Sequence, residues 1–550
     1  MTRFIKLTAV LSLAACLYIG TVMPKASMNS LQSPCAVNLT TGYNVPHDLS
    51  PSASLTDLEC FAWQSFIALN WPAVTQNWMQ NTRGVPDQTQ NFGASGTNNF
   101  AGNLVWETYK HKVELFPATG APPQSYDTKP NYVYSAKVTV PQGVNGSLFN
   151  NLDEGTEIDQ NYMFFPKNPP KPSSTGKSIT PNQDHQILFE ARANRVEYNY
   201  VVSNQYYNAT IAAKAATNTV NYLSNPSTPP QPPFISFPAG DMSQSDPSFE
   251  GAIETKAAWR ILTADEVASG RYHTASAVYY SGTDSRPVAQ NATFGLLALH
   301  IIHKTRNYPY FIFATFEQED ALKLVNGNPT GLYFITTYPK VTYLDNNNQP
   351  TAPPSPPPMF PNGILPAAQG LPVGLAGPTV VSQYTAASPV TQQVNDAVHA
   401  QIINQNPASV WQYYKLLGVQ AVPTSNNQSP YFYLANVVVE SSLPGLQLFQ
   451  GRIPGPKPPP SLPFPLPLGF PPARAQNNTF VVNGTTSTMV NMGGCMGCHA
   501  VPQRTGYDFS FILKGGPVGT PDAAGIPTTP SAARLRVLRV ARQFVEKPAR

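Results

Sequence analysis

Proline sets the organisation of this chain more than any other residue. The 550 residues include 58 prolines, and ten of them fall within the 19 residues 454–472. Proline lacks an amide hydrogen and interrupts helices and central strands, so a run this dense forms an extended polyproline II segment. The sequence therefore predicts a body over residues 31–450, a proline-rich linker over 451–476 that acts as a semi-rigid strap, and a short C-terminal segment over 477–550.

The body is predicted to be mainly β, a sandwich or barrel with a few helices. Its segments rich in aromatic and β-branched residues predict strands at residues 132–140, 185–202, 257–263, 273–281, 294–303, 310–316 and 332–343. Apolar residues at helical spacing predict a helix at residues 58–69, and residues 394–403 and 409–417 are also predicted to be helical. Pro530 and Ser531 begin a predicted terminal helix at 531–547. Only 12% of residues are charged and the net charge is +4, which argues against a nucleic-acid partner.

The N-terminus has the form of an export signal over residues 1–26. Arg3 and Lys6 precede an apolar run over residues 7–15, and residues 13–16 resemble a lipoprotein cleavage box that ends at Cys16. The apolar run resumes after Cys16, so lipidation, an uncleaved membrane anchor and conventional cleavage near Ala26 are all compatible with it. We expect an exported protein, periplasmic or anchored to the membrane through its N-terminus.

Cys495, Met496, Gly497, Cys498 and His499 form a C-x-x-C-H pentapeptide, the attachment sequence for c-type haem. Two thiols three residues apart can each bind one vinyl group of a porphyrin, and the next residue offers an imidazole to the iron. A redox dithiol would instead follow a strand at the start of a βαβ unit. A zinc site would need two further ligands, and the 51 residues after His499 contain neither Cys nor His. A structural disulfide between the two cysteines is the third alternative. The motif together with the export signal favours covalent haem c.

Cys35 and Cys60 are the two remaining cysteines of the exported chain. An oxidising compartment favours a disulfide between them, which would close a loop of about 25 residues and contribute roughly 3.5 kcal/mol. Two separate thiols are the alternative.

Several segments resemble a family of exported bacterial monohaem proteins, usually called cytochrome c family proteins. The resemblance extends over about residues 55–515, and its segments are 63–72 (WQSFIALNWP), 105–110 (VWETYK), 299–305 (LHIIHKT), 311–318 (FIFATFEQ), 494–500 (GCMGCHA) and 506–513 (GYDFSFIL). It implies a monohaem cytochrome in which Cys495, Cys498 and His499 hold the haem. It implies no particular substrate.

The sixth iron ligand is not evident from the motif, because residues 500–550 contain no Met. Met492 and Met496 lie too close to the motif to reach round a porphyrin and are expected to pack. The other candidates are His47, His111, His185, His273, His300, His303, His399, Met79, Met163, Met242 and Met359.

His300 is the first choice for this ligand. Strand alternation places it on one apolar face with Phe294, Leu296, Ala298 and Ile302, whereas an ordinary buried histidine is the competing interpretation. If the segment were helical, His300 and His303 would share a face and could form a small metal site. Residues 507–513 alternate as another predicted strand face, which would dock the tail or stack on the porphyrin.

These features predict a one-electron carrier with one covalent haem c and a redox partner protein that the sequence does not identify. The alternative is a haem enzyme or gas sensor with an open iron position, such as a peroxidase-like protein. A third interpretation is a binding module that merely carries haem.

Overall fold

The computed structural model describes most of the body and part of the C-terminal segment. The described residues are 33–77, 81–93, 102–155, 162–164, 187–224, 231–262, 264–283, 285–320, 322–325, 328–331, 333–336, 343–344, 350–351, 379–381, 387–422, 434, 450–452, 479–482, 485–491 and 494–523. The predicted export signal with Cys16, the linker prolines and the predicted terminal helix lie outside these residues. So do His185, Met79, Met359 and Met492.

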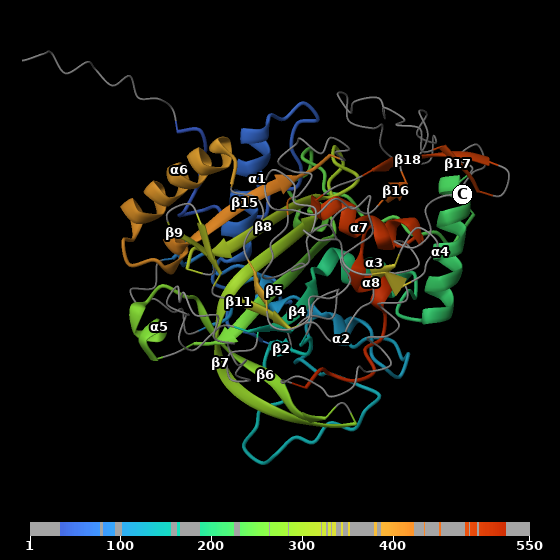
Figure 1. The fold of residues 1–550 in the computed structure, drawn as a ribbon, viewed down its shortest axis with the longest axis horizontal. Coiled ribbons are helices and arrows are strands. Elements are labelled where there is room, and N and C mark those ends of the chain that lie inside the picture. The colour runs from blue at the N-terminus through green and yellow to red at the C-terminus, as the bar shows by residue number, and fades with distance from the viewer. Residues whose placement is uncertain are drawn as a thin grey trace, which may run out of the picture.

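A mixed eight-stranded sheet forms the centre of the fold (Figure 1). Its main path runs through β1 (Lys110–His111), β4 (Leu188–Ala193), β5 (Ile253–Ile261), β7 (Arg286–His303), β6 (Thr274–Thr283) and β2 (Asn150–Leu152). β7 also pairs with β8 (Ile312–Gln318), and β8 pairs with β15 (Tyr414–Gln420). Neighbouring strands are antiparallel except β2 and β6, which are parallel.

The sheet curls until its two ends nearly meet. β2 pairs with β6, and two residues beyond its end Glu154 forms an antiparallel bridge with Phe189 of β4. The amide of Phe189 donates to the carbonyl of Glu154 over 2.8 Å, and the amide of Glu154 donates back over 3.2 Å. The path β4, β5, β7, β6 and β2 is therefore a nearly closed, barrel-like sheet, which confirms the coarse prediction of a mainly β body with few helices.

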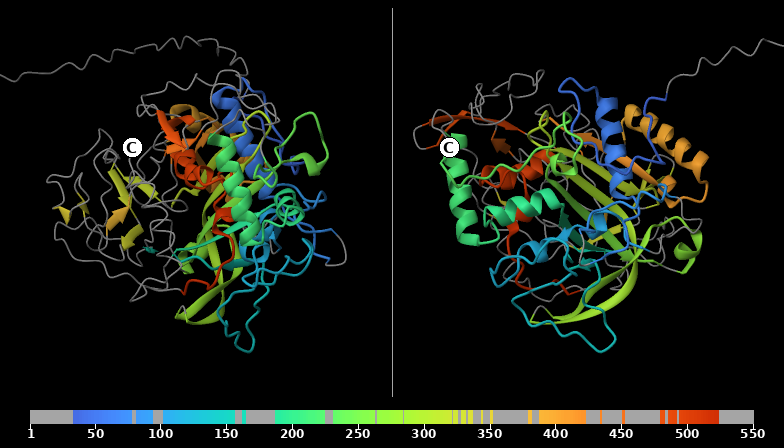
Figure 2. Two further views of the ribbon diagram at one scale, coloured as in Figure 1. Left: turned by 90° about the vertical axis from the view of Figure 1, so that its right-hand side faces the viewer. Right: turned by 180° about the vertical axis from the view of Figure 1, so that it is seen from behind.

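Helices cover both faces of the sheet (Figures 1 and 2). On one side lie α1 (Leu55–Leu69) and α6 (Pro389–Gln405). On the other side lie α3 (Arg195–Ser203), α4 (Ala209–Ser224), α7 (Gly494–Arg504) and α8 (Phe511–Gly515). The shorter helices are α2 (Lys112–Leu115), α5 (Ala264–Ser269), η1 (Trp106–Thr108), η3 (Pro247–Phe249) and η5 (Val410–Tyr413). In the part of the chain that the structure describes, no helix has the length and apolar character to cross a membrane.

Short strands form four small sheets beside the main one. They are β3 (Tyr162–Phe164) with β11 (Tyr333–Thr336) and β14 (Thr379–Val381), β9 (Leu322–Val325) with β10 (Asn328–Gly331), β12 (Tyr343–Leu344) with β13 (Pro350–Thr351), and β16 (Gln450–Arg452) with β18 (Thr485–Asn491) and β17 (Thr479–Val482).

The two helical layers enclose two apolar cores. We call the cluster under α1 and α6 the first core; it includes Trp63, Phe66, Leu299 and Phe316. The cluster under α3, α4, α7 and α8 is the second core, which includes Ala216, Ile302, Phe313, Cys495 and Phe509. β7 contributes to both, because alternate residues of a strand point to opposite faces.

A disulfide joins α1 to the segment that precedes it. Ser54 and Asp57 form a capping box at the start of α1, which fixes where the helix begins. One turn later Cys60 is bonded to Cys35, with their Cα atoms 5.4 Å apart. The Gln401 side chain of α6 donates to the carbonyl of Cys35 over 2.8 Å. The predicted disulfide is confirmed, and it ties the N-terminal segment to the helical side of the first core.

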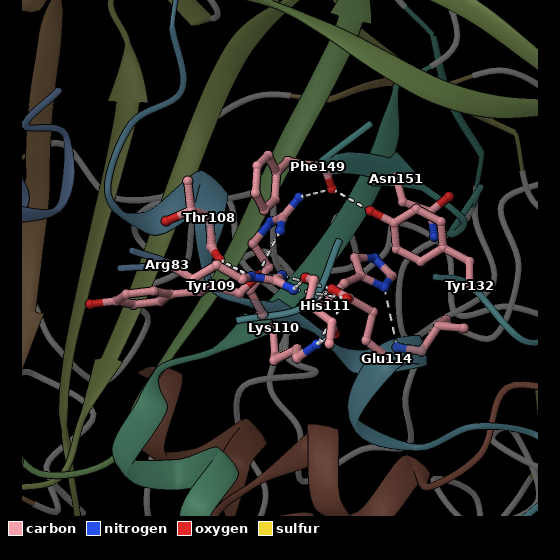
Figure 3. A network of polar contacts seen from close by, with 12 residues as sticks. Arg83, Thr108, Tyr109, Lys110, His111, Glu114, Tyr132, Phe149 and Asn151 are labelled. Atoms are coloured by element: carbon pink, nitrogen blue, oxygen red, sulfur yellow. Dashed lines mark hydrogen bonds and ion pairs between the residues drawn. The ribbon is translucent and has the colours of Figure 1, made fainter. Parts of the chain in front are cut away.

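Arg83 lies at the centre of a buried polar network that fixes the loop before β1 (Figure 3). Its five N–H groups all donate: two to the Glu114 carboxylate at 2.8 and 2.9 Å, and one each to the carbonyls of Thr108, Tyr109 and Thr128. Lys110 also contacts Glu114, at 3.2 Å. A buried guanidinium with every donor paired is a structural tie between this loop, β1 and α2.

Three local predictions differ from the structure. The predicted strand 185–202 is wrong in its second half: β4 ends at Ala193, and Asn194 caps α3 by accepting from the amide of Glu197 over 3.0 Å. The predicted strand 132–140 is an irregular segment in which only Thr139 bridges β7. The predicted helix 409–417 is the short helix η5 followed by β15, because β8 provides a partner edge for residues that pattern alone placed in a helix.

Candidate haem-attachment site

The C-x-x-C-H motif lies on one helix, α7. The helix begins at Gly494, whose φ of 70° is left-handed, and positions 495, 498 and 499 follow at separations of three and four residues. Residues three or four positions apart lie on one side of a helix, so Cys495 shares a side of α7 with Cys498 and with His499, which are themselves consecutive. Two thioether bonds and one iron ligand require such an arrangement. Cys498 is described by its backbone alone.

The start of α7 is held against β15. Cys495 is buried in the second core, and its Sγ atom lies 3.7 Å from the carbonyl oxygen of Leu434. The amide of Met496 donates to Oε1 of Gln420 over 2.8 Å, which satisfies a donor that the first turn of a helix leaves unpaired. The Met496 side chain is fully buried, as expected for a packing residue.

The imidazole of His499 has a defined orientation and tautomer. Its Nδ1 atom lies 2.7 Å from the carbonyl oxygen of Phe509. A carbonyl can only accept, so Nδ1 carries the proton, and the neutral ring then presents Nε2 as a lone pair. This is the form in which histidine binds a metal, and a hydrogen bond at the other nitrogen makes it a better ligand.

Aromatic rings surround His499. The ring centroids of Phe313 on β8 and Phe511 on α8 lie 4.8 and 4.9 Å from that of His499. Phe509 in turn packs on Phe313, with centroids 6.4 Å apart. His499 therefore lies among three aromatic rings, from β8, from the turn at Phe509 and from α8.

The backbone beside His499 is unusual. Of the four non-glycine residues with positive φ in the described ranges, three lie here: Phe311 (68°), Asp508 (47°) and Phe509 (67°). Left-handed backbone costs about 1–2 kcal/mol per residue, so surrounding structure must hold it in place. At Phe509 this conformation directs the carbonyl toward His499.

The predicted strand at residues 507–513 is wrong. The chain makes this left-handed turn instead, and Ser510 then caps α8 by accepting from the amide of Leu513 over 2.9 Å. Gly506 opens the turn with φ of 89°, and a Cβ atom there would lie 2.1 Å from the carbonyl oxygen of Ala216 in α4. The alternating apolar residues therefore belong to a turn that docks closely on α4 and to a short helix.

His300 lies directly beside the motif. It is buried on the face of β7 that carries the second core, and its ring centroid is 5.8 Å from that of His499, with 33° between the planes. Two imidazoles on opposite sides of one metal ion, with bonds of about 2.0–2.1 Å, would have centroids about 6.4 Å apart, which is within about 1 Å of this separation. The structure brings together two residues that are 199 positions apart in the sequence.

The predicted single apolar face around His300 is wrong in part. A register shift between Ala258 and Trp259 leaves Leu297 without an opposite residue, so β7 has a bulge there. Phe294 and Leu296 consequently pack in the first core. Ile302, which lies on the same face of β7 as His300, packs in the second core.

His303 points away from this site. It stacks on Phe61 of α1 with centroids 5.5 Å apart, and its Nε2 lies 2.5 Å from the carbonyl oxygen of Glu250. Burial lowers the pKa of His303 to about 4. Because the segment is a strand, the metal site that a helix would have formed from His300 and His303 is not present, and among the described residues no cluster of three or more His, Cys, Asp or Glu side chains could hold a metal ion.

The other predicted ligand candidates are engaged elsewhere or exposed. Met242 is 58% exposed, and Met163 is described by its backbone in β3. Four histidines contact polar groups away from α7: His47 with the carbonyl of Gln244, His111 with Asp153, His273 with Glu107 and His399 with the carbonyl of Tyr414.

Two sets of charged residues beside the site were missed by the sequence analysis. Lys304, just after β7, pairs with Asp508 in the left-handed turn. Burial raises the pKa of Asp508, and Lys304 opposes that rise. Burial also raises the pKa of Glu254 to about 7 and, together with Glu254, raises that of Glu197. Lys304 and Asp508 both fall in segments that carry the family resemblance, which is the signal that could have drawn attention to them.

Comparisons with known proteins do not add to this description. No protein-family model matches the chain. No curated protein and no solved structure matches it significantly either. The resemblance to cytochrome c family proteins therefore remains a prediction from the motif segments.

Proposed function

We propose that this protein is an exported monohaem c-type cytochrome that transfers single electrons. The observation that carries the proposal is the C-x-x-C-H motif on α7, with Nδ1 of His499 held by the Phe509 carbonyl, the hydrogen bond that a metal-binding histidine makes through its other nitrogen. The proposal includes membership of the exported monohaem family that the sequence resembles, and an electron partner protein outside the membrane.

The residues present fit a covalently attached haem. Cys495 and Cys498 would hold it through thioether bonds, and His499 would bind its iron on the proximal side. When bound, the haem supplies an iron that cycles between ferric and ferrous states. The chain's own residues would position that group: Phe313 and Phe511 pack against the His499 ring, and His300 offers a second imidazole.

His300 is the proposed sixth ligand. Its ring contacts that of His499, with centroids 5.8 Å apart, and it lies on a strand bonded to neighbours on both edges. If both histidines bound the iron, they would leave no position on it for a substrate, which favours a carrier over an enzyme or gas sensor.

Covalent attachment is tested by haem staining after denaturing electrophoresis, with protein made in a host that matures c-type haem. We expect one haem per chain, and no staining after Cys495→Ala with Cys498→Ala. The matched control is Cys35→Ser with Cys60→Ser, which also removes two thiols and should retain the stain. An unstained parent, or staining that survives the first pair of substitutions, contradicts the proposal.

The ligand role of His300 is tested by optical spectroscopy. The parent should be low-spin in both oxidation states and bind little carbon monoxide. His300→Ala should become high-spin and bind carbon monoxide, whereas His303→Gln, on the opposite face of the same strand, should not. A low-spin His300→Ala protein rules out this ligand, and a high-spin parent supports the open-site enzyme or sensor instead.

A further inference from the structure

The segments that carry His300 and His499 are joined by one ion pair, between Lys304 and Asp508. Lys304 follows the last residue of β7, and Asp508 immediately precedes Phe509, whose carbonyl holds His499. The two partners are 204 residues apart in the sequence, and their side chains are only 5% and 15% exposed. An ion pair this enclosed is weakly screened by solvent.

Both partners are fixed independently of each other. Oδ2 of Asp508 accepts a second bond, from the amide of Phe237 over 2.7 Å. The backbone of Lys304 donates to the carbonyl of Ala252 over 3.0 Å and accepts from the amide of Gly240 over 2.9 Å. The pair therefore connects the end of a paired strand to the turn that presents Phe509, and it holds Asp508 in a left-handed conformation.

We infer that Lys304 and Asp508 are positioning residues that set the orientation of the His499 imidazole through the Phe509 carbonyl. The inference rests on the proposed function, in which His499 binds iron. A strong bond from Nδ1–H to a carbonyl makes the imidazole more electron-rich, and an electron-rich ligand favours ferric iron. The pair thereby lowers the midpoint potential of the haem.

The decisive variant is Lys304→Met with Asp508→Asn. It removes one positive and one negative charge, so the net local charge is unchanged, and Asn retains an oxygen for the Phe237 amide and tolerates the left-handed backbone. We expect the midpoint potential to rise, because the Phe509 carbonyl is no longer held on Nδ1 of His499. Lys304→Arg alone keeps the pair and should keep the parent potential.

The matched control is Arg306→Met with Asp241→Asn. These residues form a neighbouring, more exposed ion pair at 2.8 Å, so the control removes the same charges without touching the turn. Its potential should equal that of the parent. If the Lys304 and Asp508 variant also keeps the parent potential, the pair has no positioning role.

A second measurement needs no haem. In the full chain with Cys495→Ala and Cys498→Ala, nitrogen-15 NMR of the imidazoles reports which ring nitrogen of His499 is protonated. We expect the Nδ1–H tautomer alone, and a mixture of tautomers once Lys304→Met and Asp508→Asn are added. An unchanged single tautomer overturns the inference. A parent chain that never stains for haem defeats the proposed function while leaving this tautomer result readable.

Discussion

Substitution of Gly506 by alanine should weaken the docking of the motif segment on α4. Gly506 has φ of 89°, and its added Cβ would lie 2.1 Å from the Ala216 carbonyl oxygen. The left-handed backbone costs a non-glycine residue about 1–2 kcal/mol, and the steric overlap costs about 1–3 kcal/mol more. The oxygen belongs to helix backbone, which cannot rotate away as a side chain can. We expect the free energy of unfolding to fall by about 2–5 kcal/mol.

The measurement is denaturant unfolding of the Gly506→Ala protein, combined with limited proteolysis. Because α7 and α8 flank the turn, the region around residues 494–523 should be cut faster than in the parent. Gly515→Ala is the matched control: Gly515 ends α8 and has no atom within 4 Å of an added Cβ. That substitution should be neutral or should stabilise by about 0.5–1 kcal/mol. Equal stability and equal cleavage of the two variants would refute the close contact between the turn and α4.

Three further outcomes follow from the Arg83 network, from the disulfide and from Glu317, a buried carboxyl group of β8. Arg83→Met should lower the free energy of unfolding by about 3–5 kcal/mol, because the buried Glu114 carboxylate loses two hydrogen bonds. Adding Glu114→Gln should recover part of this loss. Purely additive effects of the two substitutions in this double-mutant cycle would contradict the pairing. Reduction of the disulfide between Cys35 and Cys60 should cost about 3.5 kcal/mol in denaturant unfolding, and a difference well below 1 kcal/mol would count against its role. Burial raises the pKa of Glu317 to about 7, so the folded chain keeps this proton at pH values at which the unfolded chain has already released it. The free energy of unfolding should therefore fall as the pH rises from about 4.5 to 7, and Glu317→Gln should flatten that slope. An unchanged slope would exclude Glu317 as its source.

Local patterns predicted the elements that form the central sheet. The segments of β5, β6, β7 and β8 are rich in aromatic and β-branched residues, and they pair with one another in the structure. α1 was also predicted, since its apolar residues repeat at helical spacing after the cap at Ser54. These elements succeed because the preference of each segment agrees with its place in the fold.

Competing local signals explain the errors. Val201, Val202 and their tyrosine neighbours favour a strand, yet Asn194 caps a helix that covers the sheet. The bulge at Leu297 could not be read from alternation, because it depends on how β5 pairs with β7. His300 was the first choice for the sixth ligand from strand alternation, but that pattern did not determine its distance from His499, which depends on contacts between segments about 200 residues apart. The ligand roles of both residues stay predictions.

The pairing of β7 bears on how fast an electron could move through this site. Residues 298–303 of β7 are bonded to β5 on one edge and to β8 on the other, so the backbone that carries His300 cannot shift without breaking two ladders. If His300 binds iron as proposed, a backbone fixed in this way would keep it in nearly the same position in both oxidation states. Little nuclear rearrangement would then accompany each transfer, and a small reorganisation energy is what allows a carrier to exchange electrons rapidly with partners of similar potential.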